Sequence, residues 1–202
     1  MKFGFDLDEV VCDLTSSLLD MMENTFDVTH TIDIFAGYDF YYNDYCGDNN
    51  RNKEIADFLV DAVRDLGVLS GCKVDKRYAR LAAFLHTKGY EIHFITARND
   101  NAEGVTRDWL AKHRIPCDSL TVIGYGNEKG PVIKDLKLDY FVDDFIENIE
   151  SALKHDKNLK GNTFIVDKPW NSDYINKDVI RARNDFDIID HIIKREAGGA
   201  YD

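Results

Sequence analysis

The chain has 202 residues, of which 44% are hydrophobic, and it carries a formal net charge of −12. This length and apolar content suit one domain of ordinary size plus an insertion, and they argue against disorder. The acidic balance argues against binding to duplex nucleic acid or to an anionic membrane, although a small anionic substrate would need only a local positive site.

The first stretch, residues 1–13 (MKFGFDLDEVVCD), combines an apolar strand pattern with two carboxylates. Apolar residues alternate with small or polar ones, which predicts a short buried strand. Asp6 and Asp8 lie at its carboxyl end, and side chains at i and i+2 of an extended chain point the same way. Close carboxylates repel unless a cation offsets them, and Mg²⁺ suits oxygen ligands. Helix capping by Asp8 or Asp13 explains this stretch alone equally well.

Residues 14–75 differ in character from the rest of the chain and are predicted to form a mainly helical insertion. Helical patterns over Val10–Asn24 and over residues 51–66 flank a stretch without a regular period. Residues 1–13 and 76–202 would then form the core. The irregular stretch is rich in aromatic residues, namely Phe35, Tyr38, Phe40, Tyr41, Tyr42 and Tyr45.

From residue 76 onward, helical and strand patterns alternate. The predicted helices are Lys76–Lys88, Ala102–His113, Pro131–Leu138, Ile146–His155 and Asp187–Arg195. The predicted strands are Glu91–Thr96, Leu120–Ile123, Tyr140–Asp143 and Thr163–Val166. Short apolar strands that alternate with helices predict an α/β fold, in which a parallel sheet is covered on both faces.

Polar side chains collect at the predicted carboxyl ends of these strands, where parallel sheets bind ligands. They are Asp6, Asp8, Thr96, Arg98, Asp143 and Asp144, joined by Lys129 just before the helix that leads into residues 140–143. Each residue alone has an ordinary explanation as a helix cap, a turn residue or a solvated charge. Because they occur together at strand ends, we interpret them as one functional site.

Two further patterns and the cysteines receive structural interpretations. Residues 124–130 (GYGNEKG) have the spacing GxGxxxG rather than the dinucleotide-binding GxGxxG, and they are predicted to form a turn that delivers Lys129. Trp170, which follows Pro169, is predicted to pack rather than to contact a substrate. The four cysteines form no CxxC pair, which predicts free thiols in the cytoplasm and no zinc site.

The motifs at the strand ends, in this order, resemble those of the haloacid dehalogenase superfamily of Mg²⁺-dependent phosphohydrolases. The matching segments are Asp6-Leu7-Asp8-Glu9-Val10, Ile95-Thr96-Ala97-Arg98, Lys129 with Lys134 in reserve, and Phe141-Val142-Asp143-Asp144. A finer resemblance to the 5'(3')-deoxyribonucleotidase family rests on Thr96-Ala97-Arg98, Trp109-Leu110, Asp167-Lys168-Pro169-Trp170-Asn171 and the segment with Arg181 and Arg183. The resemblance implies a Rossmann-like three-layer α/β/α core with a helical cap inserted after the first strand.

The resemblance also implies residue roles. Asp6 would attack phosphorus to form an aspartyl-phosphate, while Asp8 would protonate the leaving oxygen and then activate water. The Mg²⁺ ligands would be Asp6, Asp8 through its backbone carbonyl, and Asp143. The phosphate-binding residues would be Thr96, Ala97, Arg98 and Lys129. Asp144 would orient Lys129 or a water on the metal.

The expected function is therefore Mg²⁺-dependent hydrolysis of a small phosphorylated substrate, with nucleoside monophosphates as the leading class. Two alternatives stay open: a phosphatase for another small metabolite, and a haloacid-dehalogenase-like module that binds without turnover. The insertion would cover the site as a cap. Its aromatic residues would either stack on a nucleobase or form the core of the insertion, and the second role is favoured for most of them. The sequence leaves open whether the chain forms a homodimer.

Overall fold

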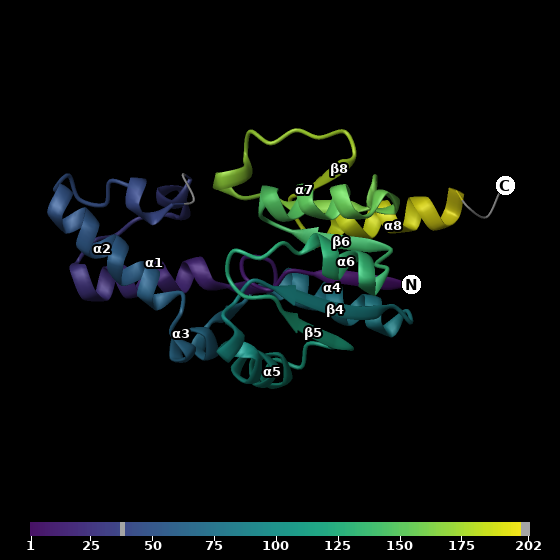
Figure 1. Ribbon diagram of the computed structural model, residues 1–202, viewed down its shortest axis with the longest axis horizontal. Helices are drawn as coiled ribbons and strands as arrows, with labels where there is room; N and C mark the ends of the chain where they lie inside the picture. Colours follow the sequence, from purple (N-terminus) through teal and green to yellow (C-terminus); the bar gives the residue numbers. More distant parts are fainter. Residues whose placement is uncertain (37–38, 199–202) are drawn as a thin grey trace.

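The computed structural model describes residues 1–36 and 39–198, and its centre is one six-stranded sheet (Figure 1). The strands are β1 (Lys2–Phe5), β4 (Glu91–Thr96), β5 (Ser119–Val122), β6 (Tyr140–Asp143), β7 (Thr163–Val166) and β8 (Val179–Ala182). Their order is β5-β4-β1-β6-β7-β8, and every neighbouring pair is parallel. The predicted α/β fold is confirmed, and β8 is an edge strand that the sequence analysis did not predict.

Alternate side chains of the strands enter two different apolar layers, as the period of two in a strand requires. On β4 and β7, Phe94 and Phe164 belong to one layer, whereas Ile95 and Ile165 belong to the other. The first layer includes residues of α4 (Lys76–Thr87), α5 (Glu103–Lys112) and α8 (Asp185–Gly198). The second includes residues of α6 (Gly130–Leu136) and α7 (Ile146–His155). Helices therefore cover both faces of the sheet, which gives the three-layer core.

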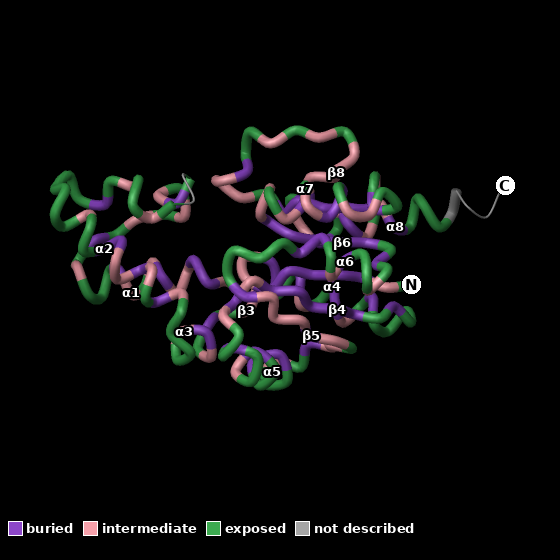
Figure 2. The backbone as a smooth tube through the Cα atoms, in the orientation of Figure 1, coloured by how far each residue is buried: buried purple, intermediate pink, exposed green. Residues whose placement is uncertain are grey.

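A helical lobe leaves the core between β1 and β4 and projects to one side of the molecule (Figure 1). It contains α1 (Leu14–Phe26), α2 (Asn49–Ala62), α3 (Leu66–Gly71) and the 3₁₀ turns η1 (Ile32–Phe35) and η2 (Phe40–Tyr42). The chain enters through β2 (Cys12–Asp13) and returns through β3 (Lys73–Val74), which pair as an antiparallel ribbon. Buried residues concentrate in the sheet and its helices, whereas much of the lobe is exposed (Figure 2).

Aspartate side chains begin all three helices of the lobe. Asp13, Asp48 and Asp65 each accept a hydrogen bond from the backbone N–H three residues further on, at 3.1, 2.9 and 3.0 Å respectively. Such caps satisfy backbone donors that the first helical turn leaves unpaired. Part of the chain's acidity therefore has a structural role and does not mark a ligand site.

Two helix boundaries in this part of the chain differ from the prediction. The helix expected from Val10 begins only at Leu14, because Val11 and Cys12 both donate backbone hydrogen bonds to the carbonyl of Leu7 and close a tight turn. The helix expected over residues 51–66 spans Asn49–Ala62 instead, and Asp65 caps a separate helix, α3. In both places a short-range polar contact overrides the apolar period.

Three short 3₁₀ turns lie in the connections of the core. They are η3 (Asp100–Ala102), η4 (Lys157–Leu159) and η5 (Pro169–Asn171). Within residues 1–36 and 39–198, no helix combines the length and the apolar character that crossing a bilayer requires.

Candidate active site

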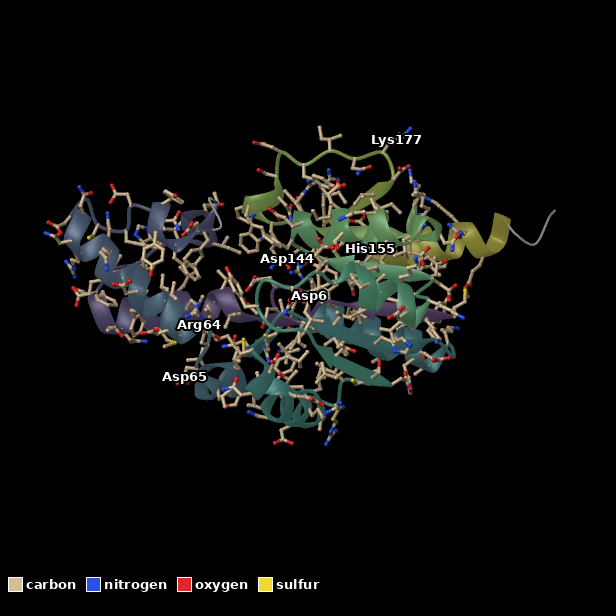
Figure 3. All side chains as sticks on the ribbon, viewed as in Figure 1. Asp6, Arg64, Asp65, Asp144, His155 and Lys177 are labelled. Carbon is tan, nitrogen blue, oxygen red and sulfur yellow. The ribbon has the colours of Figure 1, made fainter. Side chains whose placement is uncertain are left out.

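Three carboxylates and one ammonium group converge at the carboxyl ends of β1 and β6. Lys129 Nζ donates to Asp6 Oδ1 at 2.5 Å and to Asp143 Oδ2 at 2.8 Å. One carboxylate oxygen from each of Asp6, Asp143 and Asp144 lies within 4.8 Å of the others. We call these four residues the strand-end cluster, and all four are buried. Figure 3 shows Asp6 and Asp144 on the side of the core that faces the lobe.

The sheet itself positions the two aspartates that contact Lys129. The backbone N–H of Asp6 donates to the carbonyl of Val142 at 2.8 Å, so sheet pairing continues one residue beyond β1 and places Asp6 beside β6. Asp143 is the last residue of β6, and its Oδ1 accepts hydrogen bonds from the backbone N–H of Phe145 at 2.9 Å and from Asn148 Nδ2 at 3.1 Å. Both carboxylates are therefore fixed before any ligand arrives.

A glycine-rich turn delivers Lys129, as the sequence analysis predicted. Gly124 and Gly126 have φ angles of 79° and 81°, which glycine adopts without strain. A Cβ atom on Gly130 would lie only 2.5 Å from the backbone oxygen of Ser151. Glycine at this position therefore lets α6 begin directly against α7. Lys134, the reserve candidate, is exposed on α6.

The strand-end cluster carries more negative than positive charge. Burial raises the pKa of Asp6 to about 7, with Lys129 opposing this rise and Asp143 adding to it. Burial likewise raises the pKa of Asp144 well above its ordinary value, and the charges of Asp143 and Asp6 reinforce the effect. Burial opposes the charge on Lys129, but Asp143 and Asp6 raise its pKa and keep it an ammonium ion. Three carboxylates face one ammonium group, so a divalent cation would offset the excess, and the oxygen donors suit such an ion.

The carboxylate of Asp8 is held apart from this arrangement by Arg98. Arg98 Nε donates to Asp8 Oδ2 at 2.9 Å, and Nη2 donates to Oδ1 at 2.6 Å. The same guanidinium donates to Thr106 Oγ1 at 3.0 Å and to Cys12 Sγ at 3.3 Å. Arg98 is buried, whereas the side chain of Asp8 keeps 25% of its surface exposed. Arg98 therefore orients the carboxylate of Asp8, and the guanidinium of Arg98 already hydrogen-bonds to protein groups.

Thr96 is the last residue of β4, and Ala97 follows it directly. Thr96 is buried, and its Oγ1 accepts a hydrogen bond from the backbone N–H of Arg98 at 3.3 Å. Ala97 is half-buried. This contact belongs to the turn after β4 that carries Arg98.

The segment after β7 supplies contacts that the sequence analysis did not assign. Trp170 Nε1 donates to Asp144 Oδ2 at 2.9 Å, and Asn171 Nδ2 donates to the backbone oxygen of Asp144 at 2.7 Å. Lys168 Nζ forms an ion pair with Glu9 Oε2 at 2.8 Å. Trp170 therefore bonds to the site in addition to packing. The available signal was the run of polar and aromatic residues directly after a predicted strand, beside the strand that carries the aspartate pair.

The aromatic residues of the lobe divide by exposure. Phe35 and Tyr45 are buried, Phe40 is half-buried, and Tyr41 and Tyr42 are exposed by 52% and 84%. Tyr38 lies outside the described residues. The turn η1 lies against η5, so the lobe contacts the same segment that carries Trp170.

Comparisons with known proteins identify the fold, although no family model matches the chain. A Bacillus cereus protein named "Putative nucleotidase" is 24% identical over 168 residues, which cover 81% of this chain and 86% of that protein. A haloacid dehalogenase superfamily hydrolase from Ehrlichia chaffeensis matches with a TM-score of 0.52 at 13% identity, over 96% of each chain. The D,D-heptose 1.7-bisphosphate phosphatase of B. bronchiseptica, complexed with magnesium and phosphate, matches with a TM-score of 0.54 at 11% identity, over 96% of this chain and 99% of that chain. The chain therefore has the haloacid dehalogenase-like fold, as predicted.

Proposed function

We propose that this protein is a Mg²⁺-dependent phosphomonoesterase that acts on nucleoside monophosphates, as a 5'(3')-deoxyribonucleotidase. The observation that carries the proposal is the strand-end cluster: a buried aspartate at the end of the central strand, an ammonium group and an acidic pair on the adjacent strand. The motif resemblance, the fold and the hydrolase and phosphatase names of the structural neighbours support it.

Asp6 and Asp8 divide the chemistry between them. The Asp6 carboxylate attacks phosphorus, and the bond from phosphorus to the leaving oxygen breaks while Asp8 donates a proton to that oxygen. Asp8 then takes a proton from a water molecule that attacks the aspartyl-phosphate, which releases phosphate and restores Asp6. The two hydrogen bonds from Arg98 hold the carboxylate of Asp8 in one orientation for both proton transfers.

Lys129 and Thr96 bind the transferring phosphate in this proposal. An ammonium group has three N–H donors, and Lys129 uses two of them on Asp6 and Asp143, which leaves one for a phosphate oxygen. Its positive charge offsets the charge that develops on the phosphoryl group. Arg98 contributes to this site through Asp8, and Ala97 through its place in the turn after β4.

Asp6, Asp143 and the backbone carbonyl of Asp8 would hold Mg²⁺, as the motif resemblance implies. Because the carboxylate of Asp144 lies within 4.8 Å of theirs, we add it as a ligand in place of the orienting role expected from the sequence. When bound, Mg²⁺ neutralises phosphate charge so that the anionic carboxylate of Asp6 can approach phosphorus. The raised pKa values of Asp6 and Asp144 are consistent with this assignment, because burial first and the neighbouring carboxylates second disfavour the charged forms, and a bound cation would favour them.

The preference for nucleotides rests on the motif match and on the lobe. The "Putative nucleotidase" of Bacillus cereus aligns with most of this chain. Residues 14–75 would act as a cap, and the exposed rings of Tyr41 and Tyr42 offer faces on which a base could stack. A cytoplasmic location stays a prediction, and the sequence leaves homodimerisation open.

A substrate panel tests the proposal. The purified protein is assayed with Mg²⁺ against 5'- and 3'-nucleoside monophosphates of the ribo and deoxy series, sugar phosphates and p-nitrophenyl phosphate, with chelator and the Asp6→Asn variant as controls. We expect the highest kcat/KM with deoxyribonucleotides and none in chelator. A clear preference for sugar phosphates would overturn the nucleotide assignment. No turnover of any ester would favour a binding module and overturn the enzymatic proposal.

A further inference from the structure

The segment from Lys168 to Asn171 is anchored more firmly than its place between β7 and β8 requires. Asn171 is buried, and its Nδ2 donates to the backbone oxygens of Val166 and Asp144 at 2.8 and 2.7 Å. Arg181 of β8 donates to Asn171 Oδ1 and to its backbone oxygen, both at 2.8 Å. Four such hydrogen bonds are more than a surface turn needs to close, and they make the segment a rigid support beside the strand-end cluster.

This support reaches the carboxylate of Asp144 through the side chain of Trp170. The indole Nε1 of Trp170 donates to Asp144 Oδ2 at 2.9 Å. Within residues 1–36 and 39–198, Lys129 donates hydrogen bonds to Asp6 and Asp143 but not to Asp144. Its carboxylate therefore depends on Trp170 for an orientation that Asp6 and Asp143 obtain from Lys129.

The same segment also contacts the part of the chain that leads from β1 into the lobe. Lys168 Nζ pairs with Glu9, whose other carboxylate oxygen accepts a hydrogen bond from the backbone N–H of Thr15 at the start of α1. Lys168 Nζ also lies 5.7 Å from the centroid of the Trp170 ring. Trp170 is half-buried, and the turn η5 that carries it lies against η1 of the lobe as well as against the core.

We infer that Trp170 is a positioning residue for cation binding, because its N–H fixes the Asp144 carboxylate so that one oxygen converges with Asp6 and Asp143. This inference rests on the proposed function, which supplies the cation. Residues that hydrogen-bond to ligating carboxylates restrict their rotation, and losing such a contact typically costs about 10–100-fold in metal affinity. A residue that only packed would not have this effect when its ring was kept.

The chain offers a matched control, because it contains two tryptophans. Trp109 is buried, whereas Trp170 is half-buried, and Trp109 Nε1 donates to the backbone oxygen of Cys72 at 2.9 Å. Trp170→Phe and Trp109→Phe therefore each remove one indole N–H and keep an aromatic ring. They differ in whether the lost hydrogen bond ended on the strand-end cluster.

Calorimetric titration of the metal-free proteins with MgCl₂ provides the test. We expect Trp170→Phe to weaken Mg²⁺ binding by about tenfold and Trp109→Phe to leave it within about twofold of the wild type. Equal affinities of Trp170→Phe and the wild type would overturn the inference but not the proposed function. No Mg²⁺ binding by the wild type would overturn the metal assignment and the inference with it.

A second measurement covers the case in which Trp170→Phe does not fold. In Trp109→Phe, Trp170 is the only source of tryptophan fluorescence, and its indole N–H faces a carboxylate of the proposed site. We expect saturating Mg²⁺ to shift its emission, with the midpoint at the concentration that calorimetry gives for the wild type. Emission that does not change while calorimetry records Mg²⁺ binding would overturn the inference.

Discussion

The strand-end cluster and the helical lobe achieve order in different ways. In the cluster, the aspartates lie at or just beyond the ends of β1 and β6, all four side chains are buried, and hydrogen bonds from Lys129 and Trp170 hold the carboxylates. In the lobe, helices begin at aspartate caps, and a ribbon of two short strands joins the lobe to the core. We conclude that the sheet positions the residues that act on phosphate, whereas the sequence of the lobe can change without displacing those residues. The predictions below test that division, from the largest expected effect to the smallest.

Asp6→Asn should have the largest effect on activity and a small effect on folding. The amide keeps the shape of the carboxylate but cannot attack phosphorus, so we expect turnover to fall by at least about a thousandfold. Circular dichroism and a thermal melt should show the same fold. Activity near that of the wild type in Asp6→Asn would remove Asp6 as the nucleophile.

Lys129→Met should affect stability as well as activity. It leaves Asp6 and Asp143 as neighbouring buried carboxylates without their common partner, which typically costs about 3–5 kcal/mol. Urea unfolding in chelator measures this loss. Lys134→Met is the matched control, because that lysine is exposed on the adjacent helix α6 and its loss should change stability by no more than about 0.5 kcal/mol. Equal effects of the two changes would show that the cluster does not depend on Lys129.

Much of the core was predictable because its signals are local. Tyr140–Asp143, Ile146–His155 and Thr163–Val166 were predicted to the residue, since apolar runs there end at polar residues. Strand β8 was missed because three of its four residues are only half-buried, as an edge strand allows. The gathering of Asp6, Lys129 and Asp143 followed from the rule that parallel strands end at one edge.

The partners within the site were less predictable than its members. Arg98 meets Asp8 across 90 residues, and Trp170 meets Asp144 across 26. A sequence pattern places a residue at a strand end but does not choose its rotamer. Arg98 was therefore expected to bind phosphate, Trp170 was expected only to pack, and neither pairing was foreseen.

Arg98→Met should lower catalysis with little loss of substrate binding. Asp8 is partly exposed, so water can solvate its carboxylate once Arg98 is gone, but its orientation is lost. General acid catalysis contributes about 10²–10⁴-fold, and we expect the loss of orientation to cost about 10–100-fold in kcat. Arg107→Met is the control, since Arg107 pairs with Glu103 on the exposed surface of α5. A change in KM without a change in kcat would instead assign Arg98 to substrate binding.

The stability of the metal-free protein should fall as pH rises from about 4 to about 7. The pKa of Asp6 is raised to about 7 in the folded protein from an ordinary value of 3.8, so the folded state binds this proton more tightly than the unfolded state does. The contribution of Asp6 to the free energy of unfolding is then fully present below about pH 4 and is lost as Asp6 deprotonates towards pH 7. One pKa unit corresponds to about 1.4 kcal/mol, so a shift of about three units sets an upper bound of about 4 kcal/mol on this loss. Asp6→Asn should lack this component, and a pH dependence equal to that of the wild type would contradict the raised pKa.

The smallest expected effect concerns the lobe and separates recognition from packing. Tyr42 is exposed by 84% and Phe35 is buried, although both lie in the same aromatic stretch. If a nucleobase stacks on Tyr42, Tyr42→Ala should raise KM for the nucleotide by about tenfold, because stacking contributes on the order of 1–3 kcal/mol. Hydrolysis of p-nitrophenyl phosphate should stay unchanged, since that substrate does not fill a base site. Phe35→Ala should instead impair both substrates and lower the melting temperature, because it opens a cavity in the lobe.

The same pair of assays extends to Tyr41, whose hydroxyl donates to Asp57 of α2 at 2.8 Å. Tyr41→Phe removes this hydrogen bond and keeps the ring, so it should leave stacking intact, whereas Tyr41→Ala removes both. A loss of nucleotide preference in Tyr41→Ala but not in Tyr41→Phe would assign the ring to base recognition. If neither tyrosine alters the ratio of the two activities, these exposed rings do not recognise the base. The nucleotide assignment would then depend only on the motifs after β4 and β7, and Tyr41 and Tyr42 of the lobe would have no role in selecting the base.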